Sequence, residues 1–175
     1  MIAVSFLIAK GENTMKDTMK ETIETILKKW NLLEAFEKAQ GGKFHLSIKN
    51  PPFMDLVIEK VGDDQISVAH YGEQNGDAMR DPEVVFRLPD WTPLYIQQDY
   101  MGTFRETHDE NGNPIPHEVA SLKSFCATWA KNLQNQKFTT RGKATSLTHA
   151  HLLNPKVAPD AHLEAQYEDR TGDDE

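Results

Sequence analysis

The chain has 175 residues, of which 38% are hydrophobic, and its formal net charge at pH 7 is −8. This length fits one domain with extensions, and the modest hydrophobic content predicts that part of the chain lies outside any core. The acidic balance argues against general nucleic-acid binding, which requires a basic face. No apolar run approaches the roughly 20 residues of a membrane-spanning helix, so we expect a cytoplasmic protein without membrane association.

The first residues allow two interpretations. Lys10-Gly11-Glu12 can be encoded by a bacterial ribosome-binding sequence that lies a short spacer upstream of Met15. On this interpretation Met15 is the native start, and residues 1–14 are a translated leader. On the other interpretation, the apolar residues 2–9 form an edge strand. They do not read as a secretory signal, because they lack its basic start and its cleavage site.

The apolar side chains that follow recur at helical spacing. They are Met19, Ile23, Ile26, Leu27 and Trp30. A second helical piece around Phe36 is expected after a kink at Asn31. Gly41-Gly42 should end the helical region, because glycine readily adopts the left-handed conformation that closes helices.

Between residues 44 and 106 the apolar spacing changes to two residues, which is typical of half-buried strands. We expect strands near residues 44–49, 56–61, 66–71, 83–88, 94–98 and 101–106. Parallel crossovers need about a dozen residues or more, and the connections here are shorter. The strands should therefore form an antiparallel meander.

A second helix is expected from Pro116, because the next apolar residues again repeat with a helical period. Cys126 lies in this segment and is the single cysteine, so an internal disulfide is excluded and a buried thiol is expected. Residues 138–175 lack this periodicity and should form a mostly disordered acidic tail. The prediction is one α+β domain over residues 15–137, with five or six antiparallel strands and two helices on one face of the sheet.

Residues 70–83 form the densest polar segment, with one histidine and four carboxylates between two expected strands. The polar end of the strand at 94–98 should lie beside them. The resulting candidate binding face comprises His70, Tyr71, Glu73, Asn75, Asp77, Asp81, Glu83, Gln98 and Asp99. Neighbouring residues of a strand face opposite ways, so only one of His70 and Tyr71 can look toward the carboxylates.

Two other interpretations of this segment stay open. One is a metal site, since imidazole and carboxylate groups suit zinc or manganese. Its ligands would come from His70, Glu73, Asp77, Asp81 and Glu83, whose spacing matches no established motif. The other is a structural role, because Asn75-Gly76-Asp77 is strong turn chemistry. The sequence contains no nucleophilic triad signature, phosphate-binding loop, paired CxxC motif or dinucleotide-binding glycine motif.

The segment from His70 to Asp77 resembles an uncharacterised bacterial domain family. The other residues that carry the resemblance are Asp81-Pro82-Glu83, Phe86, Trp91, Pro93, Tyr95, Gln98 and Asp99. It covers about residues 40–135, and Gly72 stands where the family pattern has an aromatic residue. The family is associated with plasmids, integrative elements and phages and has no established activity. The resemblance therefore implies a setting and no mechanism.

We expect a small, non-enzymatic accessory protein of a mobile genetic element that needs no cofactor and binds another protein. The acidic surface suits a partner with a basic surface. One alternative is a hydrolase or nuclease that holds zinc or manganese within residues 70–83 and activates water with a carboxylate. Another is a structural homodimer that pairs exposed sheet edges.

Overall fold

The structure is a computed structural model, and it describes residues 18–148. The expected leader, Met15 and residues 149–175 of the expected tail lie outside the described residues. Within the described part of the chain, no helix combines the length and the apolar character that crossing a bilayer requires.

Three α-helices, seven strands and one short 3-10 helix make up the described chain. In chain order they are α1 (Thr18–Lys29), α2 (Leu33–Lys38), β1 (His45–Asn50), β2 (Phe53–Gly62), β3 (Gln65–Gln74), β4 (Asp77–Arg87), β5 (Thr92–Gln98), η1 (Asp99–Met101), β6 (Thr103–Glu106), α3 (Pro116–Asn135) and β7 (Lys143–Thr148). Asn31, with a φ of 56°, separates α1 from α2 at the position where the sequence predicts a kink.

All seven strands form one antiparallel sheet in the order β6-β5-β4-β3-β2-β1-β7. The α+β class and the antiparallel pairing are confirmed, but the expected number of five or six strands is wrong. The seventh strand, β7, comes from the segment expected to be a tail. It pairs with β1, and Lys143 lies opposite Lys49 in this pairing. Its sequence holds few large apolar residues, so only the partner strand defines it as a strand.

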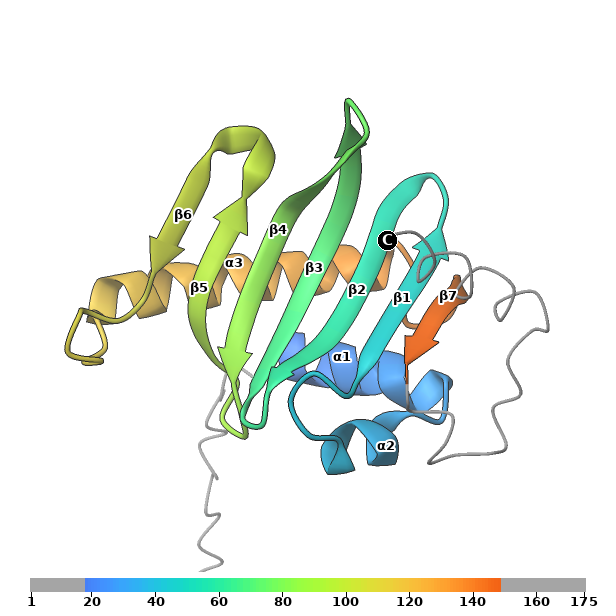
Figure 1. Cartoon of the computed structure of the whole chain (residues 1–175), viewed down its shortest axis with the longest axis horizontal. Coiled ribbons are helices and arrows are strands. Elements are labelled where there is room, and N and C mark those ends of the chain that lie inside the picture. Colours follow the sequence, from blue (N-terminus) through green and yellow to red (C-terminus); the bar gives the residue numbers. More distant parts are fainter. Residues whose placement is uncertain (1–17, 149–175) are drawn as a thin grey trace, which may run out of the picture.

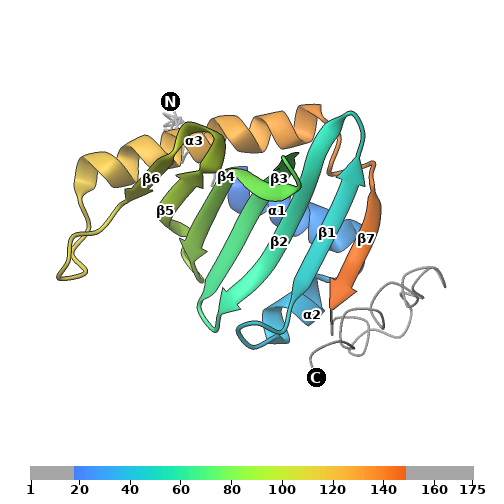
Figure 2. The ribbon, with the colours of Figure 1, turned by 45° about the horizontal axis from the view of Figure 1, so that its top comes forward.

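The helices α1 and α3 lie on the same side of the sheet and run behind the strands in both views (Figure 1, Figure 2). Cys126 is buried in α3, as expected. Facing the helices, alternate strand residues build the apolar core; they include Leu46, Ile48, Leu56, Ile58, Ile66, Val68, Val84, Phe86 and Ile96. Burial of this apolar area is the main stabilising contribution to the fold.

The remaining strand residues point to the other side of the sheet, because side chains alternate between the two faces. Direct pairing aligns one row of them across β1 to β6: Ser47, Val57, Ala69, Glu83, Gln97 and Phe104. We call the side that carries this row the open face, since none of the described helices covers it (Figure 1). Ser47, Val57, Ala69 and Glu83 are buried, so a partner can reach this row at Gln97 and Phe104.

Phe138 follows α3 and is 0% exposed, although it opens the segment expected to be a tail. Its ring lies 5.6 Å from the ring of His70. Phe138→Ala should lower the free energy of unfolding by about 3–5 kcal/mol, because removal of a buried ring leaves a cavity. Phe104→Ala removes the same atoms from a residue that is 56% exposed, so its effect should stay below about 1 kcal/mol. Urea unfolding measures both values, and equal losses would show that Phe138 is not a core residue.

Candidate functional site

Residues 72–82 are not a loop, because they extend β3 and β4 into a long hairpin that projects beyond the neighbouring strands (Figure 1). Gln74 pairs with Asp77, so only Asn75 and Gly76 form the turn. Their φ angles of 57° and 89° are those of a two-residue hairpin turn that asparagine and glycine favour. The turn chemistry read from the sequence is confirmed.

An irregularity in the pairing of β3 with β4 decides which side chains share the open face. Ala69 pairs with Glu83 and Tyr71 pairs with Arg80, so one residue of β3 lies opposite two residues of β4. Arg80 and Glu83 are three positions apart, which in a regular strand would place them on opposite faces. The extra residue in β4 places both on the open face.

The Arg80 guanidinium is held by two carboxylates, one from its own strand β4 and one from η1. Its Nε donates to Asp99 Oδ2 at 2.9 Å, and its second terminal nitrogen donates to Asp99 Oδ1 at 3.3 Å. Its first terminal nitrogen donates to Glu83 Oε2 at 3.4 Å. The backbone N–H of Arg80 also donates to Asp99, at 2.9 Å. Paired charge-assisted bonds of this kind fix the orientation of the guanidinium.

Glu83 is a buried carboxylate, with an exposed fraction of 7%. Ser67 Oγ donates to its Oε1 at 2.7 Å, and Arg80 binds its other oxygen. Gln97 Nε2 donates to Asp99 Oδ1 at 2.8 Å. A carboxylate can stay charged under such burial only with partners of this kind. We call Ser67, Arg80, Glu83, Gln97 and Asp99 the Arg80 network.

The network sets the protonation of its members. Hydrogen bonds from Arg80 hold the pKa of the Asp99 carboxyl below its usual range, and the same contact raises the pKa of Arg80. Burial raises the pKa of Tyr71 and of Tyr95, and the negative charge of Glu83 acts in the same direction. At neutral pH the site therefore presents a charged guanidinium and two protonated phenols.

The structure divides the nine predicted face residues among four places. Tyr71, Glu83 and Asp99 lie at the Arg80 network, and Gln98 joins Asp81 through a 3.0 Å hydrogen bond. This bond places the two predicted segments side by side, as the sequence indicated. The other residues lie elsewhere: Glu73, Asn75 and Asp77 at the exposed end of the hairpin, and His70 on the core side of β3.

The five residues considered as metal ligands are not brought together. His70 and Glu83 lie on opposite faces of the sheet, and Glu73 and Asp77 lie near the hairpin turn. Within residues 18–148, no group of three or more histidine, cysteine, aspartate or glutamate side chains is placed to hold a metal ion.

Three residues at this site are not predicted as site residues from the sequence: Arg80, Ser67 and Tyr95. Arg80 lies inside the segment that was singled out, three positions before Glu83, so simple alternation assigns the two to different faces. Only the irregular pairing in β4 unites them. A strand proline beside them, Pro82, was the available signal, because prolines within sheets favour irregular positions.

Gly72 makes room for an aromatic side chain from another element. A Cβ atom at Gly72 would lie 2.6 Å from the hydroxyl oxygen of Tyr100 and 3.2 Å from the sulfur of Met54. The Tyr100 hydroxyl donates to the Glu73 carbonyl at 3.2 Å. A larger side chain at position 72 would therefore displace the Tyr100 ring.

Comparison with known proteins gives one match. The model of a family described as a domain of unknown function (DUF6908) matches residues 21–139, which include all of α3 and all of α1 except residues 18–20. No curated protein and no solved structure matches the chain.

His70 is 6% exposed and lies between the rings of Trp129 and Phe138, at 5.7 and 5.6 Å. Its Nδ1 is 3.2 Å from the Asp55 carbonyl oxygen. Burial lowers its pKa, and the weaker influences of Asp55 and Asp81 oppose this shift. In the unfolded chain, the His70 imidazole therefore takes up a proton at about pH 6.5, whereas in the folded protein it does so only at lower pH.

The free energy of unfolding should thus fall as the pH drops below about 6.5, by up to about 1.4 kcal/mol per pH unit. His70→Gln keeps an N–H donor but cannot titrate, so it should lack this component. Urea unfolding of both proteins between about pH 8 and about pH 5 measures the difference. A difference that does not change with pH would show that His70 is protonated in the folded state.

Proposed function

Since the chain belongs to the DUF6908 family, whose function is unknown, we propose its function from the structure: it is a non-enzymatic module that binds a protein partner on the open face of its sheet. The observation that carries the proposal is the oriented guanidinium of Arg80 on a sheet face that no described helix covers. The proposed setting in a mobile genetic element rests on the family resemblance alone.

The residue types around Arg80 support binding to a protein. Tyr95 and Phe104 lie next to each other on the open face, with ring centroids 5.4 Å apart, and Phe104 is exposed. Tyrosine, other aromatic residues and arginine contribute most of the binding energy in many protein interfaces. Arg80 is already oriented by Asp99 and Glu83, so binding would cost little further loss of side-chain freedom.

The protonation states of Asp99, Tyr71 and Tyr95 favour the binding of a partner over proton transfer in catalysis. Asp99 has a lowered pKa and accepts four hydrogen bonds, which makes it a weak base. Tyr71 and Tyr95 have raised pKa values and stay protonated at neutral pH. These groups can donate and accept hydrogen bonds to a partner, and none of them has a pKa near neutrality that a general acid or base requires.

The expected partner has a basic surface. The chain carries a net charge of −8, and Glu73 and Asp77 are exposed at the end of the β3–β4 hairpin beside the open face. Complementary charge on two protein surfaces mainly raises the association rate and the selectivity for the correct partner, and it contributes less to the affinity. The contact should therefore weaken as the salt concentration rises.

Partner binding should depend on Arg80 and Phe104. With the full chain as bait in its native host, Phe104→Ala and Arg80→Lys should each weaken capture of the same protein by tenfold or more, on the order of a moderate interface hot spot. Arg80→Lys keeps the charge beside Glu83 but loses the paired geometry. Quantitative affinity capture with crosslinking measures the loss.

Arg105→Ala is the matched control, because Arg105 is also a strand arginine in an ion pair, with Glu118 of α3, but it is not part of the Arg80 network. It should leave capture unchanged. Capture that is equally strong with all three variants would refute the open face as the binding surface. Recovery of the chain itself as the captured protein would favour the homodimer instead.

A further inference from the structure

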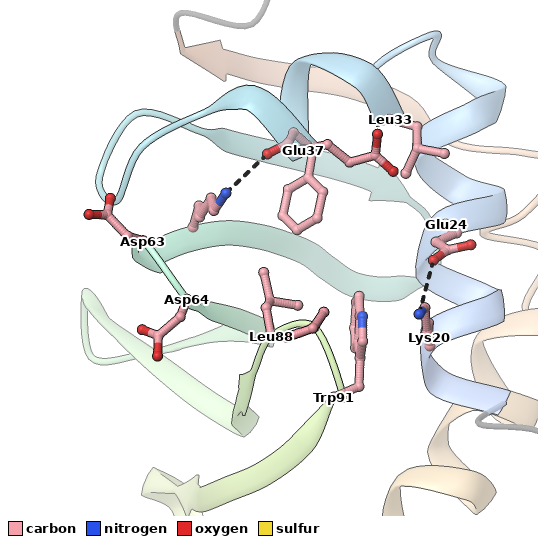
Figure 3. Close-up of a pocket in the computed structure, with 11 residues that line it drawn as sticks. Lys20, Glu24, Leu33, Glu37, Asp63, Asp64, Leu88 and Trp91 are labelled. Atoms are coloured by element: carbon pink, nitrogen blue, oxygen red, sulfur yellow. Dashed lines mark hydrogen bonds and ion pairs between the residues drawn. The ribbon is translucent and has the colours of Figure 1, made fainter.

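A pocket of about 370 Å³ lies on the helix side of the sheet, between α1, α2 and the turns that follow β2 and β4 (Figure 3). Its lining combines apolar and charged side chains: Lys20, Glu24, Leu33, Phe36, Glu37, Lys60, Asp63, Asp64, Leu88, Pro89 and Trp91. None of these residues belongs to the Arg80 network, which lies on the other face. The pocket is thus a second, separate surface feature.

Well-packed aromatic and aliphatic side chains line the pocket. Phe36 and Trp91 are both buried. Phe36 packs edge-to-face against Phe44, with ring centroids 5.3 Å apart, and Trp91 packs in a tilted arrangement against Phe86, at 5.6 Å. Trp91 has a φ of 55°, a left-handed conformation that is unfavourable for a bulky residue. Strained residues of this kind cluster at ligand-binding positions, because there the placement of the side chain is what matters.

Lys60 supplies a buried ammonium group to the lining, with an exposed fraction of 6%. It donates one long hydrogen bond, 3.4 Å, to the Phe36 carbonyl oxygen, and its Nζ lies 5.5 Å from the centroid of the Phe36 ring. An ammonium group has three N–H donors, and leaving them unused inside a protein is unfavourable. A carbonyl or carboxylate oxygen of a ligand would satisfy the remaining donors.

The rim of the pocket is acidic. Four carboxylates line the pocket against two ammonium groups, and Lys20 is already 3.9 Å from Glu24. Asp63 accepts a hydrogen bond from the Gly41 N–H at 2.8 Å. Within residues 18–148, the carboxylates of Glu37 and Asp64 take part in no hydrogen bond or ion pair. They are available to a positively charged ligand.

We propose that this pocket binds a segment of a protein partner in which an apolar side chain is flanked by lysine or arginine. The apolar side chain lies between Phe36, Leu88 and Trp91, and a main-chain carbonyl of the segment accepts hydrogen bonds from Lys60. The flanking cations pair with Glu37 and Asp64. Charge complementarity selects this occupant, since an acidic or neutral ligand leaves the rim carboxylates uncompensated. The inference rests on the proposed protein-binding function and names where a basic segment of the partner is held.

Three synthetic peptides test this proposal on the full chain: Lys-Lys-Leu-Lys-Lys, the same peptide with glycine in place of leucine, and Glu-Glu-Leu-Glu-Glu. The first peptide should shift the indole N–H resonance of Trp91 in a saturable way. The glycine peptide lacks the apolar anchor and the glutamate peptide has the wrong charge, so each should bind about tenfold more weakly or worse. Equal binding of the three peptides, or no saturable shift by the first, overturns the proposal.

Two variants test which side chains of the pocket contribute to peptide binding. Glu37→Gln combined with Asp64→Asn should weaken the first peptide about tenfold or more, with little effect on folding, because neither carboxylate has a partner to lose among the described residues. Lys60→Met should also weaken the peptide while the protein stays folded, since an apolar chain of similar length replaces a buried charge. Unchanged peptide affinity in both variants overturns the proposal.

The matched control is Glu106→Gln combined with Glu110→Gln, which makes the same charge change at two exposed glutamates outside the pocket lining. It should leave peptide binding unchanged; an equal loss there would mean that only the net charge matters.

Failure of the peptide test is distinguishable from failure of the proposed function. If the pocket binds no peptide but Phe104→Ala still abolishes capture, the open face remains the binding surface and only the pocket assignment is lost.

Discussion

Two residues of β4 lie opposite one residue of β3 between the pairs Ala69–Glu83 and Tyr71–Arg80, and this irregularity controls the chemistry of the open face. Without it, Arg80 would point toward the helices and Glu83 would remain a buried carboxylate without a cation. With it, Arg80 reaches Glu83 on its own strand and Asp99 beyond β5. One extra residue thus creates the charge compensation that the site requires.

The fold is asymmetric, and the asymmetry separates the two surfaces that we assign to binding. On one side, α1 and α3 cover the alternate apolar residues of the strands and form the core. On the other, the same strands present Tyr95, Phe104 and the Arg80 network without a helix above them. The pocket around Trp91 lies on the helix side, where α2 leaves space beside the turns of the sheet (Figure 3).

Charge is used differently at the two surfaces. At the open face, the carboxylates of Glu83 and Asp99 are matched by Arg80, so they orient a cation and add little net potential. At the pocket, the carboxylates of Glu37 and Asp64 have no ion-pair partner among residues 18–148, and Lys60 of the same lining is buried. The acidic composition of the chain is thus also present locally, since four carboxylates and two ammonium groups line the pocket.

The sequence by itself determined the features that depend on neighbouring residues: the helical stripe of α1, the helix around Cys126 and the turn at Asn75-Gly76. It also singled out the segment that forms the β3–β4 hairpin and carries Glu83 of the Arg80 network. Only the tertiary structure decided that β7 completes the sheet, that Arg80 shares a face with Glu83 and that His70 belongs to the core. Helix period and turn type are encoded within a few residues, whereas strand pairing and register depend on partners distant in the sequence.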